Sequence, residues 1–198
     1  MSQKNILAVI DAKRYVRRKH SFLKENRMTD LLLLPLSADQ HDTFSTLLQR
    51  AFQKGAEDAF GKLDEPIISR EDIDKSLLNP NADAFFVMED DAIVGGAVIA
   101  KDRQEEGRFS LDLLFTLTGK ENSGIGIRVW EKIEAHYPEA KIWETHTPYF
   151  EKRNIHFYVN KCGFHIVEFF HPGHPDPHGV PEDLPSAEYF FRFEKVVG

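Results

Sequence analysis

The chain has 198 residues, of which 41% are hydrophobic and 29% are charged, and its formal net charge is −7. This is the composition of a folded globular protein with room for one substantial domain, and it excludes wholesale disorder. The acidic balance argues against a nucleic-acid partner, because phosphate binding depends on clustered cations, and no apolar run approaches the roughly 18–20 residues of a membrane span.

Charge is unevenly distributed along the chain. Residues 1–27 carry eight lysines and arginines and two acids, whereas the remaining residues are strongly acidic. We expect residues 1–27 to form a solvated or loosely docked basic N-terminal extension and residues 28–198 to form the folded domain. Two alternatives are an arm that contacts nucleic acid or a membrane, and a native start at Met28, shortly before the first predicted strand.

Cys162 is the single cysteine of the chain. One cysteine cannot form an intrachain disulfide, which fits a reducing, cytoplasmic compartment. We interpret Cys162 as a small buried residue before the turn at Gly163 and Phe164, rather than as a nucleophile.

The first half of the chain alternates between predicted strands and helices. Its elements are a strand at 31–36, a helix from Ser37 through Phe52, an ambiguous stretch at 55–69, a helix from Ser69 to about Asn79, and strands at 84–88, 93–100 and 109–117. Both serines are predicted helix caps, because their side-chain oxygens can accept hydrogen bonds from first-turn N–H groups. The pair Gly95-Gly96 inside a strand indicates a bulge or a close approach of another segment.

The second half has a different rhythm. Its predicted elements are a helix at 125–137, a strand at 141–147, a helix at 151–160, a strand at 164–170, a loop rich in proline and histidine at 171–186, and a strand at 188–196. Antiparallel strands followed by a strand–helix–strand unit are typical of an α+β fold with a mixed sheet.

The best local signal for a binding site is the stretch from Leu111 to Gly126, where a strand leads through a polar loop into a helix that opens with Gly124-Ile-Gly126. Such a helix start presents unpaired N–H groups and partial positive charge, which suit a pyrophosphate. It is neither the dinucleotide-binding fingerprint nor a P-loop. A plain strand-to-helix turn is the alternative interpretation.

A second pattern follows about thirty residues later, at residues 154–167, as Asn-Ile-His-Phe-Tyr-Val-Asn-Lys-Cys-Gly-Phe-His-Ile-Val. Together the two stretches resemble the GNAT N-acetyltransferase superfamily. The first is similar to the family's CoA-binding motif, a strand Leu-Phe-Val-x-Pro followed by Gln/Arg-x-x-Gly-x-Gly. The second is similar to Asn-x-x-Ala-x-x-Phe-Tyr-x-x-x-Gly-Phe. The resemblance covers about residues 30–196.

The resemblance implies a fold and an activity. The fold would be a GNAT-like mixed, mostly antiparallel sheet flanked by helices, with a V-shaped splay between two parallel strands. The activity would be transfer of an acetyl group from acetyl-CoA, a cosubstrate, to a primary amine of a small molecule or peptide by direct attack. A non-catalytic acyl-CoA-binding or protein-binding module is the alternative, and a homodimer is an open possibility.

The resemblance also implies site residues. In the family, Tyr158 would match the tyrosine that protonates the departing CoA thiolate, and Asn154 would lie near the pantetheine arm. The residues expected to bind acetyl-CoA through the strand, the loop and the helix start are Phe115, Thr116, Leu117, Glu121, Asn122, Ser123, Gly124, Ile125 and Gly126.

The chain departs from the family pattern at four places. Glu121 replaces the usual Gln/Arg, so we expect weaker pyrophosphate binding, and Thr118 replaces a proline. Four residues rather than three separate Tyr158 from Gly163, which would change the direction of the phenol. Glu151 replaces the family asparagine seven positions before the tyrosine.

The chemistry also needs a proton acceptor, because an attacking amine of pKa about 10.4 must lose its proton. Asp112 is our candidate base, since it lies on the strand expected to run beside the acetyl group. A surface position or a cross-strand salt bridge is an equally weighted alternative for Asp112.

Two other segments, a loop rich in histidine and proline and an acidic stretch, carry side chains that could form sites. The histidines of His171-Pro-Gly-His174-Pro-Asp176-Pro-His178 could bind a metal or wall the acceptor cleft, but a stiff surface loop is our interpretation, and we predict no metal site. Residues 50–69 carry Glu57, Asp58, Asp64 and Glu65, which suit a cationic amine or simply a solvated loop.

Overall fold

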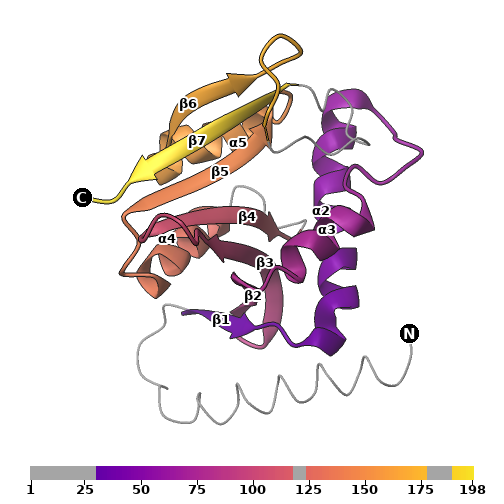
Figure 1. Cartoon of the computed structure of the whole chain (residues 1–198). Helices are drawn as coiled ribbons and strands as arrows, with labels where there is room; N and C mark the ends of the chain where they lie inside the picture. Colours follow the sequence, from indigo (N-terminus) through magenta and orange to yellow (C-terminus); the bar gives the residue numbers. More distant parts are fainter. Residues whose placement is uncertain (1–29, 118–123, 178–188) are drawn as a thin grey trace.

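A seven-stranded mixed sheet lies at the centre of the molecule, with helices against it (Figure 1). The computed structural model describes residues 30–117, 124–177 and 189–198. Its strands are β1 (Leu31–Pro35), β2 (Ala82–Glu89), β3 (Ala92–Lys101), β4 (Arg108–Thr116), β5 (Ile142–Pro148), β6 (His165–Phe170) and β7 (Phe190–Val196). Its helical elements are η1 (Ala38–Gln40), α2 (His41–Phe60), α3 (Arg70–Leu77), α4 (Ile125–His136), α5 (Lys152–Phe157) and the π-helical turn η2 (Tyr158–Cys162). None of the helices in these ranges is long and apolar enough to cross a membrane.

The strand order is β1-β2-β3-β4-β5-β7-β6, and every neighbouring pair is antiparallel except β4 with β5, which is parallel. The pairing of β4 with β5 ends after three residue pairs, the last of which is Ser110 with Glu144. Beyond that pair the two strands diverge, as Figure 1 shows. The predicted α+β fold with a V-shaped splay is therefore confirmed.

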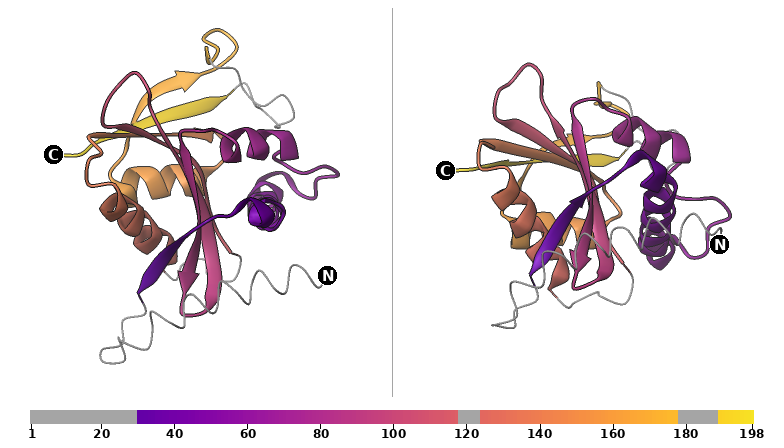
Figure 2. Two further views of the ribbon diagram at one scale, coloured as in Figure 1. Left: turned by 60° about the horizontal axis from the view of Figure 1, so that its bottom comes forward. Right: turned by 90° about the horizontal axis from the view of Figure 1, so that it is seen from below.

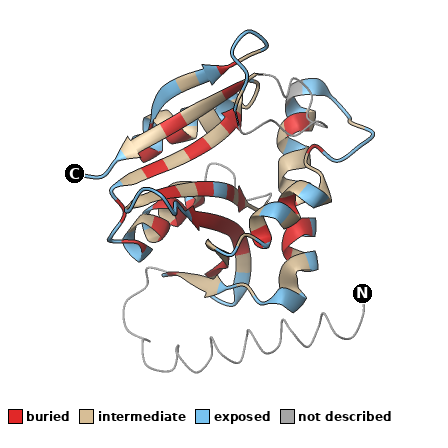
Figure 3. Cartoon of the chain, viewed as in Figure 1, coloured by how far each residue is buried: buried red, intermediate tan, exposed pale blue. Residues whose placement is uncertain are grey.

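Helices cover the sheet on both sides. In Figure 2, α2 and α3 lie on one side, while α4 and α5 lie on the other. The α2-side core consists of the buried residues Phe44, Leu48, Ile73, Leu77, Phe86, Met88, Val98, Leu113 and Phe115. The α4-side core is larger, and its bulkiest members are Phe109, Trp130, Ile133, Trp143, Phe164 and Phe193. Buried positions accordingly concentrate on the inner strands and on the inward faces of the helices (Figure 3).

A β-bulge in β4 changes which core its side chains enter. Two consecutive residues of β3 pair with Leu113 and Leu111, so Asp112 is the extra residue of β4. Leu111, before the bulge, belongs to the α4-side core, whereas Leu113 and Phe115 belong to the α2-side core. Because Asp112 lies just past the last pair with β5, the bulge coincides with the start of the splay.

The glycine pair in β3 permits the close approach that the sequence predicts. A Cβ atom on Gly95 would lie 2.3 Å from the carbonyl oxygen of Phe115. A Cβ atom on Gly96 would lie 2.6 Å from ring atoms of both Phe115 and Phe44. Glycine is therefore needed here for space, and a larger residue would push apart β3, β4 and α2.

Most predicted elements are present, and the helix ends differ most. The Ser69 hydroxyl accepts a hydrogen bond from the Asp72 N–H at 3.0 Å, as expected of a cap. The first long helix, however, ends at Phe60 and not at Phe52. The predicted helix at 151–160 is split into α5 and the π-helical turn η2, which ends at Cys162. The extra residue before Gly163 is therefore absorbed within the helix.

Candidate active site

The strands β4 and β5 part at a point that we call the fork, and we call the other end of the opening, at Thr116 and Pro148, the mouth. At the fork, the buried Thr145 hydroxyl donates a hydrogen bond to the Leu111 carbonyl oxygen at 2.9 Å. The main-chain pairing of β4 with β5 ends before Leu111, so the Thr145 side chain supplies the hydrogen bond that the Leu111 carbonyl oxygen would otherwise lack.

The edge of β4 presents main-chain groups to the opening. In an antiparallel pair these groups alternate in direction, and the Leu117 N–H donates to the Val94 carbonyl oxygen at 2.9 Å, towards β3. The main-chain groups of Phe115 point the same way, whereas those of Leu114 and Thr116 face the opening. Of the three strand residues predicted to contact CoA, Thr116 thus has the main-chain groups best directed for it.

Helix α4 follows β4 in the chain and begins at Ile125. Gly124 is the residue before its first turn and has φ of 75°, a left-handed conformation that favours glycine. No described atom lies within 4 Å of a Cβ placed on Gly124, so approach to its backbone is open from that side. Ile125 is buried, while Gly126 packs near the ring of Phe157. The predicted pyrophosphate contacts Glu121, Asn122 and Ser123, like Thr118, lie outside the described residues.

Tyr158 lies beside the fork. It is the first residue of η2, and its ring packs between those of Phe164 and Phe193, with centroid distances of 5.6 Å to each. Desolvation raises the pKa of Tyr158 to about 12, and a side-chain hydrogen bond with Thr145 opposes the rise. The phenol is therefore fully protonated at neutral pH, and it is linked through Thr145 to the main chain of β4.

Asn154 lies one turn before Tyr158 on α5. Its side-chain N–H group donates to the hydroxyl of Thr147 on β5, although at 3.4 Å the bond is long. Thr147 is buried, so the contact holds α5 against the second strand of the V. The structure thus places Asn154 next to the opening, and its predicted contact with pantetheine stays a prediction.

Asp112 sits on the bulge, on the α2 side of the sheet. Its carboxylate accepts a hydrogen bond from the Ser110 hydroxyl at 2.6 Å. Although the side chain is open to solvent, desolvation by the surrounding protein raises the pKa of Asp112, the Ser110 hydrogen bond opposes the rise, and the charge of Glu144 adds to it. From the sequence, the alternative role of Asp112 was a surface position or a cross-strand salt bridge. Asp112 forms no salt bridge with any described residue.

A cavity of about 710 Å³ opens beside the V. Its wall combines the C-terminal turns of α2, the segment between β5 and α5, and the residue before β7. The lining residues are Gly55, Asp58, Phe60, Tyr149, Phe150, Glu151, Lys152, Arg153 and Tyr189. Ring contacts join two of them, since Phe60 and Phe150 meet edge to face at 4.6 Å. This size is in the range of small-molecule sites.

Glu151 is the half-buried carboxylate of that cavity. Desolvation raises the pKa of Glu151, the charge of Arg153 opposes the rise, and the charge of Asp58 adds to it. The sequence marked Glu151 only as a departure from the family pattern, and it gave no sign that this residue would face α2. Of the four acids singled out between residues 50 and 69, only Asp58 lines the cavity.

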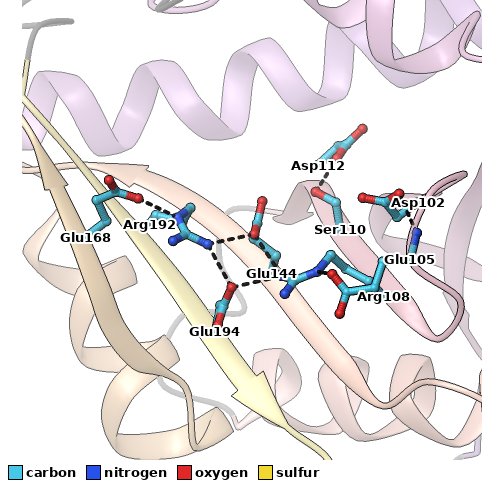
Figure 4. Close-up of polar contacts among 9 residues, drawn as sticks. All are labelled: Asp102, Glu105, Arg108, Ser110, Asp112, Glu144, Glu168, Arg192 and Glu194. Carbon is cyan, nitrogen blue, oxygen red and sulfur yellow. Dashed lines mark hydrogen bonds and ion pairs between the residues drawn. The ribbon is translucent and has the colours of Figure 1, made fainter. Parts of the chain in front are cut away.

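A row of ion pairs crosses β4, β5, β7 and β6 on the face away from α4, as Figure 4 shows. We call it the charge ladder, and its members are Glu105, Arg108, Glu144, Arg192, Glu194 and Glu168. Arg192 lies 3.0 Å from Glu144, 2.7 Å from Glu194 and 2.9 Å from Glu168. Hydrogen bonds to Glu194 and Glu105 raise the pKa of Arg108 despite its desolvation.

No local sequence pattern predicts the charge ladder, because its members meet only through strand pairing. Arg108 and Glu194 lie 86 residues apart in the chain but 2.8 Å apart in space. The ladder adjoins the fork, since Glu144 is the last residue of β5 that pairs with β4. It also continues to the histidine loop, where the Glu168 carboxylate contacts the His174 ring at 2.9 Å.

Three further predictions concern Cys162, a metal site and the histidine loop. Cys162 is buried, as expected, and desolvation raises its pKa to about 12, so its thiol stays protonated. Within residues 30–117, 124–177 and 189–198, no group of three acids, histidines or cysteines is arranged to hold a metal. In the histidine loop, His171 and His174 pair through their main chains, while His178 lies outside the described residues.

Comparisons with known proteins agree with this architecture. The sequence model of the acetyltransferase (GNAT) family matches residues 42–164. The protein YrkN of Bacillus subtilis (strain 168), named as uncharacterized, is 44% identical over 161 residues, which are 78% of this chain and 86% of YrkN.

Solved structures of low sequence identity share the fold. A GNAT family acetyltransferase from Elizabethkingia anophelis with acetyl-CoA bound is similar with a TM-score of 0.60 and 16% identity, covering 86% of this chain and 100% of that one. An acetyltransferase from Bacillus subtilis in complex with CoA has a TM-score of 0.59 and 18% identity, with 86% of this chain and 100% of that one covered.

Proposed function

Because the chain belongs to the GNAT acetyltransferase family, we propose that it transfers the acetyl group of acetyl-CoA to a primary amine of a small molecule or peptide. The proposal depends most on one observation, the fork. There, β4 and β5 part after three residue pairs, and Tyr158 lies beside the point of parting. A parallel pair that opens next to a helix start offers a slot between strand edges, where ligands of mixed sheets bind.

In the proposed reaction, the thioester lies along the edge of β4, where the main-chain groups of Leu114 and Thr116 face the opening. The first-turn N–H groups of α4, with Gly124 and Gly126, would hold the pyrophosphate at the mouth. The loop residues Glu121 to Ser123 would complete that contact. These main-chain donors bind without needing a particular side chain, so Glu121 would weaken binding without abolishing it.

The proton transfers complete the chemistry. The amine nitrogen forms a bond with the thioester carbonyl carbon, and the bond from that carbon to sulfur breaks. Asp112 would accept the proton that the amine gives up, and its raised pKa suits a base better than that of an ordinary surface carboxylate. Tyr158 would donate its phenol proton to the departing thiolate, whose conjugate thiol has a pKa of about 8.5. The products are the acetylated amine and free CoA.

The alternative function is a module that binds acyl-CoA or a protein without turnover. One observation favours it, namely that the Tyr158 hydroxyl is enclosed and already shares a hydrogen bond with Thr145. A phenol held in this way must be released from Thr145, or act through it, to reach a thiolate. Binding and turnover therefore need to be measured separately.

The test combines calorimetric titration with acetyl-CoA and an assay of thiol release with a panel of amines. We expect acetyl-CoA to bind and at least one amine to cause thiol release. Tyr158→Phe should lower kcat by about 100-fold with little change in acetyl-CoA affinity. Tyr137→Phe is the matched control, because that buried phenol bonds to Asp83 at the other end of α4.

The outcomes separate the two functions. Acetyl-CoA binding without thiol release for any amine would favour the binding module. No binding of acetyl-CoA at all would remove the acetyltransferase and the acyl-CoA-binding module and would leave the protein-binding module.

A further inference from the structure

The cavity beside the V has a chemistry that narrows the acceptor. We propose that it binds a monoamine carried on an apolar, ring-bearing body, with the ammonium group paired to the carboxylate of Glu151. This inference rests on the proposed acetyl transfer, since it assigns the acceptor of that reaction.

The first argument is the aromatic wall. Phe60, Tyr149, Phe150 and Tyr189 all line the cavity. Phe60 and Tyr149 remain 46% and 55% exposed, which is unusual for large rings unless something covers them in use. A flat apolar group could lie against these rings, and a cation near their faces would gain further attraction.

The second argument is that one carboxylate of the cavity has no partner. Among the described residues, Glu151 makes no side-chain hydrogen bond and no ion pair. Its Oε1 atom lies 3.0 Å from where a Cβ atom on Gly55 would be, so α2 partly covers it and reduces its solvation. A partly desolvated, unpaired carboxylate is costly, and a bound ammonium would offset that cost.

The other acid of the cavity is already neutralised. Asp58 lies 3.4 Å from the Lys54 ammonium and 3.5 Å from the Arg153 guanidinium. Glu151 is therefore the one carboxylate among the lining residues that makes no ion pair with a described residue, which suits an acceptor with one ammonium group. A polyamine would bring additional cations next to Lys152 and Arg153, which also line the cavity, and should bind less well.

The third argument connects the cavity to the reaction. The carbonyl oxygen of Glu151 accepts a hydrogen bond from the Ile155 N–H at 3.0 Å, so Glu151 stands at the start of the helical segment that leads to Tyr158, and its charge is the smallest of the causes that raise the pKa of that phenol. Glu151 also directly precedes α5, the helix that carries Asn154. An amine held at Glu151 would consequently sit between the cavity and the fork, with its apolar body directed away from the thioester.

The experiment measures binding and turnover with 2-phenylethylamine, butylamine and spermidine. Binding is measured by calorimetry in the presence of CoA, and turnover by thiol release from acetyl-CoA. The variants are Glu151→Gln and the matched control Glu65→Gln, whose exposed side chain does not line the cavity. Glu151 provides no side-chain cap to α5, so the substitution should leave the helix intact.

We expect phenylethylamine to bind better than spermidine. Glu151→Gln should raise the dissociation constant and the KM for phenylethylamine by roughly tenfold, with acetyl-CoA affinity unchanged. Phe60→Leu should weaken phenylethylamine by roughly threefold and leave butylamine unaffected, because it removes a ring and keeps the apolar contact.

The proposal is overturned if spermidine binds better than phenylethylamine, or if Glu151→Gln changes amine binding no more than Glu65→Gln does. Retained acetyl-CoA binding and turnover with another amine would then leave the acetyltransferase function standing. Loss of acetyl-CoA binding in the unaltered protein would instead count against the proposed function itself.

Discussion

Strands β1 to β4 and strands β5, β7 and β6 form two halves of one sheet that are stabilised differently. In the first half, β3 is buried over seven consecutive residues, as expected of a strand covered on both faces. In the second half, β5 alternates between buried and partly exposed residues, and the exposed face carries the charge ladder. The α4-side face of the second half carries core residues such as Trp143 and Phe193.

This difference shows where the molecule can accommodate polar chemistry. The first half has little freedom, because a β-carbon on either glycine of β3 would already collide with β4. The second half leaves one face accessible, and the fork, Asp112 and the cavity all adjoin that face. The apolar half acts as a rigid support whose outer strand, β4, forms one wall of the opening, and the charged half supplies the other wall.

The largest expected effect comes from replacing one phenylalanine by alanine in each half of the sheet. Phe44→Ala should lower the free energy of unfolding by about 3–5 kcal/mol, because Phe44 is completely buried against Phe86 and Phe115. Phe169→Ala on β6 should cost about 1 kcal/mol, because that ring is 37% exposed. Urea unfolding of both variants measures the difference, and equal losses would break the comparison.

The junction between the halves should be sensitive to a smaller change. Thr145→Val removes the hydroxyl that bonds to Leu111 and should lower the free energy of unfolding by about 1–2 kcal/mol, since a buried carbonyl loses its partner. Thr145→Ser keeps the hydroxyl and should recover most of that loss. If serine were destabilising and valine were not, packing of the methyl group and not the hydrogen bond would hold the fork.

The charge ladder should contribute less, and its contribution should depend on salt. Arg192→Met removes three ion pairs, and because a quarter of the side chain is exposed we expect a loss of about 1 kcal/mol. The loss should shrink in 1 M sodium chloride, where the screening length is about 3 Å. Lys75→Met, in the exposed pairs of α3, is the control and should change stability much less than Arg192→Met, because both of its ion pairs are open to solvent. A loss that does not respond to salt would contradict this account.

The smallest expected effect concerns Asp112. The folded protein raises the pKa of this carboxyl, so folding favours its protonated form. The resulting stabilisation is fully present below the unfolded-state pKa of about 3.9 and is lost as the pH rises through the folded-state pKa. Asp112→Asn should therefore have the same melting temperature as the wild type at pH 3 and a slightly higher one at pH 7.

Asp91→Asn, in the exposed turn between β2 and β3, supplies the charge-matched control. A lower melting temperature of Asp112→Asn at pH 7 would show that the carboxylate is stabilising, which would argue against a base held ready at the bulge.

The order and type of the elements were predictable from local signals. Caps such as Ser69 act within a few residues, and the apolar runs of the strands carry their own pattern. The end of α2 was less predictable, because glycine normally weakens a helix and Gly55 nevertheless lies inside α2. The structure gives a reason for the glycine. A Cβ atom on Gly55 would lie 3.0 Å from the Oε1 atom of Glu151, a residue that is distant in the sequence.

The candidate site was predictable only where a motif carried it. The spacing between Tyr158 and Gly163 revealed an extra residue, but the π-helical form that absorbs it could not be read from a count. The cavity and the charge ladder depend on which residues of β5, β6 and β7 become neighbours. The pairing register of these strands is set by tertiary packing, so no local sequence pattern predicts it.

The bulge at Asp112 has a consequence for how this chain can vary. Because Leu113 and Leu111 pair with the adjacent residues Val98 and Ile99, removing this one position would leave Leu113 and Phe115 in the α2-side core and make the pairing with β3 continuous. Many different residues could occupy position 112 without altering the backbone path, and the strand can also become one residue shorter at this place. Deletion scanning of β4 should therefore find that loss of Asp112 destabilises the fold less than loss of Leu111 or Leu113, because each of those deletions would place Asp112 at a core position.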